Sequence, residues 1–196
     1  MKTALIIIDL QNDFLDPAGA YARGGCANPL AQALPERVLP LARAVKAAGG
    51  LVVASQFTLW PGPDGEPLIS PHLKALRPFL RRGDFAPGSR GQANVDVLQP
   101  VVDVSVQKVA YSAFFNTQLD WLLRKCAVQR VAVCGIVTNG GVASTVRDAH
   151  MRDFDTWVIA DGCAAFKPEV HANALADMGT VARLSSVQGF IDEGLA

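Results

Sequence analysis

The feature that most constrains the fold is a series of short apolar runs that alternate with segments of helical periodicity. Residues 3–8 read Thr-Ala-Leu-Ile-Ile-Ile, and residues 51–55 read Leu-Val-Val-Ala-Ser. Neither run alternates polar with apolar residues, which is typical of strands buried on both faces of a parallel sheet. Between the two runs, Val38, Leu41 and Val45 follow the spacing of a helix that buries one face. This alternation predicts an α/β fold.

We expect a Rossmann-like, three-layer α/β/α sandwich with a central, mostly parallel sheet of about six strands. The predicted strands cover residues 3–8, 51–55, 104–108, 130–135, 156–160 and 181–187. The predicted helices cover residues 35–48, 72–79, 117–126, 141–152 and 168–178. Residues 60–91 are rich in Pro and Gly, and they are predicted to form a long excursion that lines a functional site.

Length and charge limit the classes of function. The 196 residues are expected to form a single domain over residues 1–196, because this length is enough for one substantial core. Eighteen basic residues balance 18 acidic ones, so the chain has no electrostatic footprint for nucleic acid or an anionic membrane. We therefore expect a small-molecule substrate. No apolar run reaches the roughly 20 residues that span a bilayer, and the N-terminus leads directly into a strand, so we expect a cytoplasmic protein.

The four cysteines are scattered along the chain, with no CxxC pair and no spacing typical of zinc ligands. They are Cys26, Cys126, Cys134 and Cys163. We expect them to be reduced thiols that mainly fill the core. Cys134 is the cysteine nearest to the candidate site, but it lies inside a predicted strand, so we do not expect it to contact substrate.

Polar residues stand at the ends of the predicted strands. Asp9 follows the first strand, Gln56 follows the second, Lys108 ends the third, and residues 136–141 turn from the fourth strand into a helix. In open α/β sheets ligands bind beyond the carboxyl ends of the strands, so one crevice is expected to collect all four. A turn from a strand into a helix also aims backbone N–H groups at a bound ligand.

Asp9 and Lys108 are the candidate groups for proton transfer. Burial raises the pKa of a carboxyl group and a neighbouring ammonium lowers it, so an Asp–Lys pair in a dry crevice can exchange protons with a substrate. Two plainer interpretations exist for the same residues. Asp9 can cap the segment that follows it, and Lys108 can be a solvated surface lysine. The residues taken one at a time leave these alternatives open.

Three segments resemble those of the isochorismatase-like hydrolase superfamily. They are residues 6–14, which include Asp9 and Phe14, residues 108–115, which include Lys108 and Tyr111, and residues 134–145. Most members of that superfamily carry an Asp, a Lys and a nucleophilic Cys. Here the first two are in register, and the third position is Gly141. The resemblance implies that Asp9, Lys108 and Gly141 are the catalytic positions.

The resemblance also implies further features of the site. A cis peptide is expected between Ile136 and Val137, with the N–H groups of Val137 and Gly141 turned toward the substrate. Phe14, Tyr111, Val137 and Asn139 are expected to contribute to substrate binding. The segment after the second strand lacks the His cluster of the nicotinamidases, so neither a metal nor another cofactor is expected. The chain is expected to form a homodimer or a higher homo-oligomer.

Within the superfamily, the chain is similar to the true isochorismatases, which cleave an enol ether and also carry glycine in place of the cysteine. Gln56 and residues 82–88 match their pattern, and Arg82 is expected to pair with a substrate carboxylate unless it is a solvated loop residue. Val137 and Asn139 depart from it, because isochorismatases usually show Tyr and His there. The favoured prediction is enol-ether hydrolysis of a small carboxylate-bearing metabolite, with Asp9 as general acid and no covalent intermediate.

Two other functions remain as alternatives. One is an amidase-type hydrolase of the same superfamily, in which Asp9 activates a water molecule directly. The other is a catalytically silent ligand-binding protein that has lost its nucleophile. Retention of both Asp9 and Lys108 argues against the silent protein, because a buried ion pair is costly to keep without a use.

Overall fold

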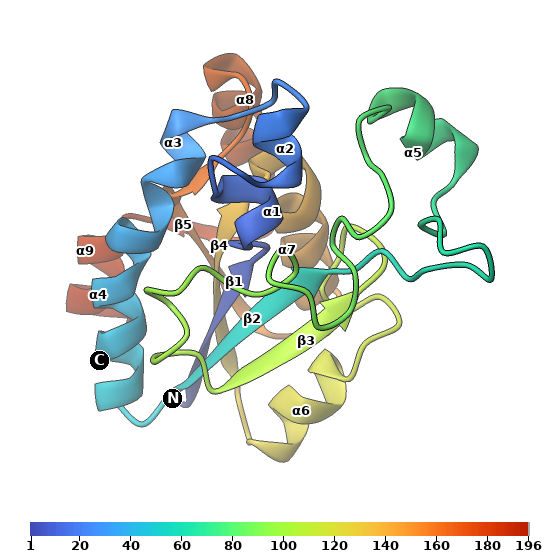
Figure 1. Cartoon of the computed structure of the whole chain (residues 1–196). Helices are drawn as coiled ribbons and strands as arrows, with labels where there is room; N and C mark the ends of the chain where they lie inside the picture. Colours follow the sequence, from blue (N-terminus) through green and yellow to red (C-terminus); the bar gives the residue numbers. More distant parts are fainter. Residues whose placement is uncertain (196) are drawn as a thin grey trace.

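The computed structural model describes residues 1–195, which form a six-stranded sheet with helices on both faces (Figure 1). The strands are β1 (Thr3–Ile8), β2 (Leu51–Phe57), β3 (Val104–Lys108), β4 (Arg130–Ile136), β5 (Asp155–Ala164) and β6 (Arg183–Ser185). Their order is β3-β2-β1-β4-β5-β6, and every pairing is parallel. The prediction of an α/β fold around a parallel sheet of six strands is confirmed.

The helices cover the sheet on two sides. Their bounds are α1 (Asn12–Leu15), α2 (Ala20–Arg23), α3 (Pro29–Gln32), α4 (Leu34–Ala47), α5 (Pro71–Leu76), α6 (Leu119–Lys125), α7 (Ala143–His150), α8 (Pro168–Met178) and α9 (Val187–Gly189), with π-helical turns η1 (Thr138–Val142) and η2 (Phe190–Gly194). Helix α4 contacts α9, whereas α7 contacts α8. Figure 1 shows α4 and α9 on the side of the sheet away from α6 and α7. Among the described residues, no helix is long and apolar enough to cross a membrane.

Helix α4 shows how the sequence pattern builds the core. Val38, Leu41 and Val45, spaced for one helical face, are all fully buried. They pack in the same cluster as the isoleucines of β1, which are buried on both sides of the sheet. Burial of apolar area of this kind is the main favourable contribution to folding. The central strand β1, which leads into Asp9, is therefore anchored in the main apolar core.

Several element boundaries differ from the sequence prediction. Strand β5 extends to Ala164 because its register shifts opposite β4, between Val133 and Gly135, and pairing then resumes. The predicted helix over residues 141–152 begins earlier, as the π-helical turn η1, before α7 takes over. Strand β6 covers only three residues of the predicted 181–187. The short helices α1, α2 and α3 were not predicted, since four residues carry too little periodicity to detect.

The excursion over residues 60–91 leaves the sheet and returns to it. Its helix α5 projects away from the body of the molecule (Figure 1). This helix ends earlier than predicted because Pro78 cannot continue the helical backbone and restricts the residue before it. The returning part is hydrogen-bonded to the segment that follows β1, where Asp13 Oδ2 accepts a hydrogen bond of 2.6 Å from the backbone N–H of Phe85. Gln11 Nε2 likewise donates to the backbone carbonyl of Gln92 at 2.8 Å.

Candidate active site

Asp9 and Lys108 form a buried ion pair at the carboxyl ends of β1 and β3. Asp9 follows β1 directly, and Lys108 is the last residue of β3. The Lys108 Nζ atom lies 2.7 Å from Asp9 Oδ2, and the two side chains are only 2% and 6% exposed. Strand β2 lies between β1 and β3, so the pair forms across it. The structure thus brings together the two residues that the sequence suggests for proton transfer.

Ser55, in the intervening strand β2, completes this cluster. Its Oγ donates a hydrogen bond of 2.7 Å to Asp9 Oδ1, and the residue is fully buried. The parallel register pairs Ser55 with Ile8, which places the hydroxyl beside the carboxylate that follows β1. Sequence reasoning missed Ser55 because a small polar residue inside an apolar run does not reveal the face on which it lies. Its only sequence signal is that it is the one hydroxyl residue in that run.

Two opposing effects set the protonation of Asp9. Burial raises the pKa of its carboxyl group, and the Lys108 ammonium and then the Ser55 hydroxyl oppose that shift. The net direction is upward from the usual value. Asp9 also has a φ of +54°, in the left-handed region that Asp tolerates better than most residues. A desolvated carboxyl group held between two donors is well placed to exchange a proton with a ligand.

Gly141 faces this pair from the turn after β4. A Cβ atom added to Gly141 would lie 2.8 Å from Ile8 Cγ2, 3.1 Å from the backbone oxygen of Ile136 and 3.5 Å from Asp9 Oδ2. The first of these distances is shorter than a normal van der Waals contact. A side chain at position 141 would therefore press on β1 and come into contact with the Asp9 carboxylate.

The chain enters this turn through a tight backbone passage. Gly135 has a φ of +113°, and a Cβ atom there would lie 2.1 Å from the backbone oxygen of Ile8, so only glycine fits beside β1. The peptide bond between Ile136 and Val137 is cis, at the position that the resemblance implies. The turn therefore starts from a fixed point next to the end of β1.

A hydroxyl group ties the turn to the segment that follows β3. Thr145 Oγ1 donates a hydrogen bond of 2.7 Å to the backbone oxygen of Gly141 and accepts one of 3.0 Å from the N–H of Ala113. Thr145 is fully buried, so these bonds are shielded from water. Gly141 and Ala113 are thereby linked through a single side chain.

Tyr111, Val137 and Asn139 surround the outer side of the turn. A Cβ atom on Gly140 would lie 2.9 Å from Val137 Cγ2 and 3.3 Å from Tyr111 Cε1, so both side chains lie against that glycine. Tyr111 is 61% exposed, Val137 is half-buried and Asn139 is exposed. Of the predicted binding residues, Val137 and Asn139 therefore lie in the turn that carries Gly141 and Tyr111 lies against it, with Tyr111 and Asn139 open to solvent.

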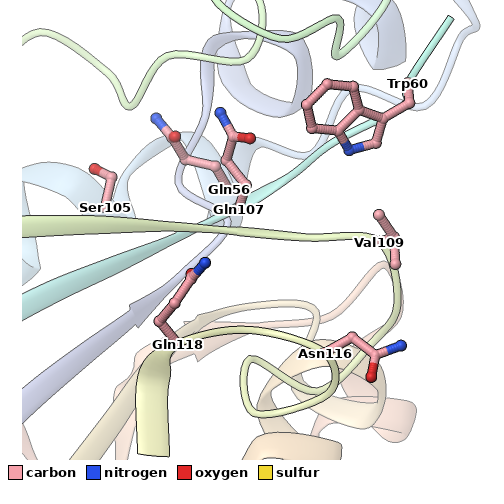
Figure 2. A pocket seen from close by; sticks show the side chains of 7 residues that line it. All are labelled: Gln56, Trp60, Ser105, Gln107, Val109, Asn116 and Gln118. Atoms are coloured by element: carbon pink, nitrogen blue, oxygen red, sulfur yellow. The ribbon is translucent and has the colours of Figure 1, made fainter. Parts of the chain in front are cut away.

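Gln56 is not part of this cluster. Strand β2 continues to Phe57, past its predicted end, so Gln56 is a residue within the strand. Side chains alternate along a strand, and since Ser55 faces Asp9, Gln56 faces the opposite side of the sheet. There it is paired in register with Gln107 and lines a separate cavity (Figure 2). The expectation that Gln56 joins the crevice with Asp9 is corrected accordingly.

Arg82 is engaged elsewhere. Its Nε lies 3.3 Å from Glu66 Oε1, and it donates a hydrogen bond of 2.5 Å to the backbone oxygen of Asp64. The Arg82 and Glu66 side chains are 66% and 55% exposed, so this is a solvated pair between two parts of the excursion. The structure agrees with the loop interpretation of Arg82 and does not bring it to the buried pair.

Phe14 contributes through packing. Its ring centroid lies 4.6 Å from those of Tyr21 and Phe85, within a second apolar cluster. Phe57 belongs to the same group of rings and lies 6.3 Å from Phe14. The Lys108 Nζ atom stands 5.7 Å from the Phe57 ring centroid, within the range of a cation–π contact. Phe14 therefore supports the ring that backs the lysine.

The segment after β2 does not fit the metal site of the nicotinamidases. Thr58 Oγ1 donates to the backbone oxygen of Gln56 and accepts from Gln92 Nε2, while the neighbouring Leu59 is buried and apolar. Within residues 1–195, no three or more His, Cys, Asp or Glu side chains gather as metal ligands would. The donor set for that metal is thus not in place, and no step proposed below runs through one.

Neither buried cysteine supplies the missing nucleophile. Cys134 lies in β4 and Cys163 in β5, and both are buried. Burial raises the pKa of the Cys163 thiol to about 12, and it raises the pKa of Cys134 well above its usual value. Both thiols are therefore protonated at neutral pH, whereas the thiolate is the form that attacks a substrate.

A parallel sheet with an Asp–Lys pair at its carboxyl edge, next to a turn from a strand into a helix, defines an α/β enzyme site. The chain belongs to the isochorismatase family, because the family profile described as the isochorismatase domain matches residues 3–188. This membership supports the prediction that the protein is a hydrolase.

Named relatives refine the comparison. The chain is 35% identical over 189 residues to the ureidoacrylate amidohydrolase RutB of Methylobacterium radiotolerans. The alignment covers 91% of this chain and 73% of the relative. The chain is 32% identical over 179 residues to the RutB of Azorhizobium caulinodans, covering 86% of this chain and 78% of the relative. Both names denote hydrolysis of a C–N bond.

Solved structures agree with the fold. A cysteine hydrolase from Pseudomonas syringae pv. phaseolicola has a TM-score of 0.84 and 25% identity, covering 100% of this chain and 94% of its own. An isochorismatase-like hydrolase from Alkaliphilus metalliredigens has a TM-score of 0.81 and 24% identity, with 98% of each chain covered. The latter likeness concerns the fold alone.

Proposed function

We propose that this protein hydrolyses a C–N bond of a small, carboxylate-bearing amide, carbamoyl or ureido compound by direct attack of water. The observation that carries this proposal is the buried Asp9–Lys108 pair beside Gly141, a position with no nucleophilic side chain. The named relatives, which are amidohydrolases, support the choice of bond. This is the amidase-type alternative that the sequence leaves open, and it replaces enol-ether cleavage as the first candidate.

In the proposed reaction, Asp9 acts first as a base. It accepts a proton from water, whose oxygen adds to the carbonyl carbon of the substrate. The C–N bond then breaks, and the nitrogen leaves with the proton that Asp9 returns. Lys108 holds the Asp9 carboxylate and, with the backbone N–H groups of the turn, stabilises the negative charge that develops on the carbonyl oxygen. Since no side chain forms an ester or thioester, no covalent intermediate arises.

Enol-ether hydrolysis is the second candidate, and the burial of Asp9 in an apolar setting is the observation that favours it. Burial raises the pKa of Asp9, and a protonated carboxyl group can donate to the vinyl carbon of an enol ether. Water would then attack the resulting oxocarbenium ion.

A product assay separates the two candidates. Purified protein is incubated with a panel of N-carbamoyl and ureido acids and, separately, with carboxylate-bearing vinyl ethers, and the products are identified by mass spectrometry. Release of ammonia or amine from the first set supports C–N hydrolysis. Release of an enol-derived ketone from the second set alone overturns it in favour of enol-ether cleavage. The homodimer or higher oligomer remains a prediction, which a native mass measurement tests.

A further inference from the structure

A cavity lies at the face of β3 that points away from the Asp9–Lys108 pair. It has a volume of about 550 Å³ and is lined by Gln56, Trp60, Ser105, Gln107, Val109, Asn116 and Gln118. Figure 2 shows Gln56 and Gln107 side by side, with the Trp60 indole at one end and Gln118 and Asn116 on the other side of β3. A cavity of this size matches the volumes of small-molecule sites.

Four carboxamide groups line this cavity with unused hydrogen-bonding capacity, and those of Gln56 and Gln107 lie side by side (Figure 2). The backbone oxygen of Gln56 accepts a hydrogen bond from Thr58 Oγ1, and that of Gln118 accepts one from the N–H of Leu122. Within the part of the chain that the structure describes, no protein group bonds to the carboxamides of the four residues, which also include Gln107 and Asn116. By contrast, the carboxamide of Gln11 is fully occupied by backbone groups. The lining carboxamides are therefore available to a ligand.

The composition of the lining indicates the class of that ligand. None of the seven residues is charged, so the lining offers no ion pair to a phosphate or a carboxylate. A carboxamide presents a donor and an acceptor side by side, which pairs with the matching edge of a heterocyclic base such as adenine. The indole of Trp60, which is 48% exposed, offers a flat face on which such a ring can stack.

We propose that this cavity binds a neutral nucleoside or free nucleobase, in a site separate from the Asp9–Lys108 pair. The register of Gln56 with Gln107 holds two carboxamides on one face of the sheet, while Lys108, the next residue of β3, points to the other. The two sites thus share a strand and lie on opposite faces of it. Binding here does not depend on the hydrolytic function proposed above.

Adenosine is the probe for the test, measured by isothermal titration calorimetry with the full chain. Wild-type protein is expected to bind it, and Trp60→Ala and Gln107→Ala are each expected to weaken binding about tenfold, as loss of one stacked or bidentate contact predicts. AMP is expected to bind no more tightly than adenosine. Trp121→Ala and Gln129→Ala, which alter an exposed tryptophan and an exposed glutamine outside the cavity, are expected to leave binding unchanged.

Lys108→Ala separates this proposal from the proposed function. This variant is expected to lose hydrolysis and to keep adenosine binding, so each proposal can fail alone. The proposal of a nucleoside site is overturned if wild-type protein does not bind adenosine at millimolar concentration, or if the control variants weaken binding as much as Trp60→Ala does. It is also overturned if Lys108→Ala protein that circular dichroism shows to be folded fails to bind adenosine, or if maltose binds through Trp60 and Gln107 and adenosine does not.

Discussion

The two faces of β3 carry opposite kinds of chemistry. On one face Lys108 is buried, charged and paired with Asp9 at 2.7 Å, in a cluster whose polar atoms are all engaged. On the other face, Gln107 is exposed and neutral and borders a cavity with available carboxamides. The difference follows from the two-residue period of a strand. One face of a single strand can therefore carry a desolvated charged pair while its other face carries a neutral surface exposed to solvent.

Removal of either member of the buried pair is expected to have the largest effect. Asp9→Asn and Lys108→Ala should each lower the rate of hydrolysis by roughly 10²–10⁴-fold, the range for loss of a proton-transfer group. Lys108→Ala should also destabilise the fold by about 3–5 kcal/mol, because it leaves the Asp9 charge buried without its partner. Steady-state kinetics and thermal unfolding measure the two effects.

The matched control for this prediction is Asp96→Asn, since the Asp96 side chain is 74% exposed. It should change neither rate nor stability. Near wild-type activity in Asp9→Asn would refute the role of Asp9 in proton transfer, and with it the contrast between the two faces.

Substitutions of Gly141 test whether substrate or water uses the space that a side chain at this position would fill. Gly141→Cys should lose most of the native activity without becoming a thiol-dependent amidase, since its Cβ would lie 2.8 Å from Ile8 Cγ2 and its side chain would cover Asp9. A destabilisation of about 1–3 kcal/mol is expected from this overpacking. Gly141→Ala should behave alike, because the Cβ atom itself causes the conflict. Full activity in both variants would show that substrate and water do not use this space.

Ser55 offers a finer test of the buried face. Ser55→Ala removes a hydrogen bond that lowers the pKa of Asp9, so the pKa should rise further. If Asp9 acts as a base, activity increases with pH as Asp9 ionises, and this increase should move to higher pH in the variant, with kcat reduced about tenfold at neutral pH. Ser55→Thr, which retains the hydroxyl, should restore the wild-type profile.

The direction of the pH profile also distinguishes the two candidate reactions. A general acid at Asp9 would give activity that falls as pH rises through the same pKa. An unshifted profile in Ser55→Ala would mean that the hydroxyl does not influence the reacting carboxyl group.

Thiol modification should have the smallest effect. Iodoacetamide is expected to leave activity unchanged, because Cys134 and Cys163 are buried with raised pKa values and position 141 carries no thiol. Residual activity is measured, and the modified thiols are identified by peptide mapping of the same sample. Unfolded protein serves as the control in which all four cysteines react. Rapid inactivation that maps to Cys134 would instead point to a displaced nucleophile.

Much of this arrangement is predictable from the sequence, for a physical reason. Strands over residues 3–8 and 104–108 and the helix over residues 168–178 match β1, β3 and α8 in full. An all-apolar run, the alternation in Val-Ser-Val-Gln and proline at a helix start are each strong local signals. Asp9 and Lys108 follow from the same logic, since the ends of parallel strands meet at one edge of the sheet.

What the sequence could not predict depends on which way a side chain points. Ser55 and Gln56 are neighbours, yet only Ser55 faces Asp9, and an all-apolar run gives no phase from which to decide this. Arg82 was placed by resemblance, but its partners Glu66 and Asp64 come from a Pro- and Gly-rich excursion whose path has no periodic signal. Such side-chain directions are set by tertiary packing.

The measurement that tests the central claim most directly is a search for a covalent intermediate during turnover. The protein is mixed with an excess of a ureido or N-carbamoyl acid that it hydrolyses, the reaction is quenched with acid during turnover, and the intact protein mass is measured. Direct attack of water predicts that the protein mass does not change. An acyl or carbamoyl adduct on the protein that forms and decays at the rate of turnover would contradict the account.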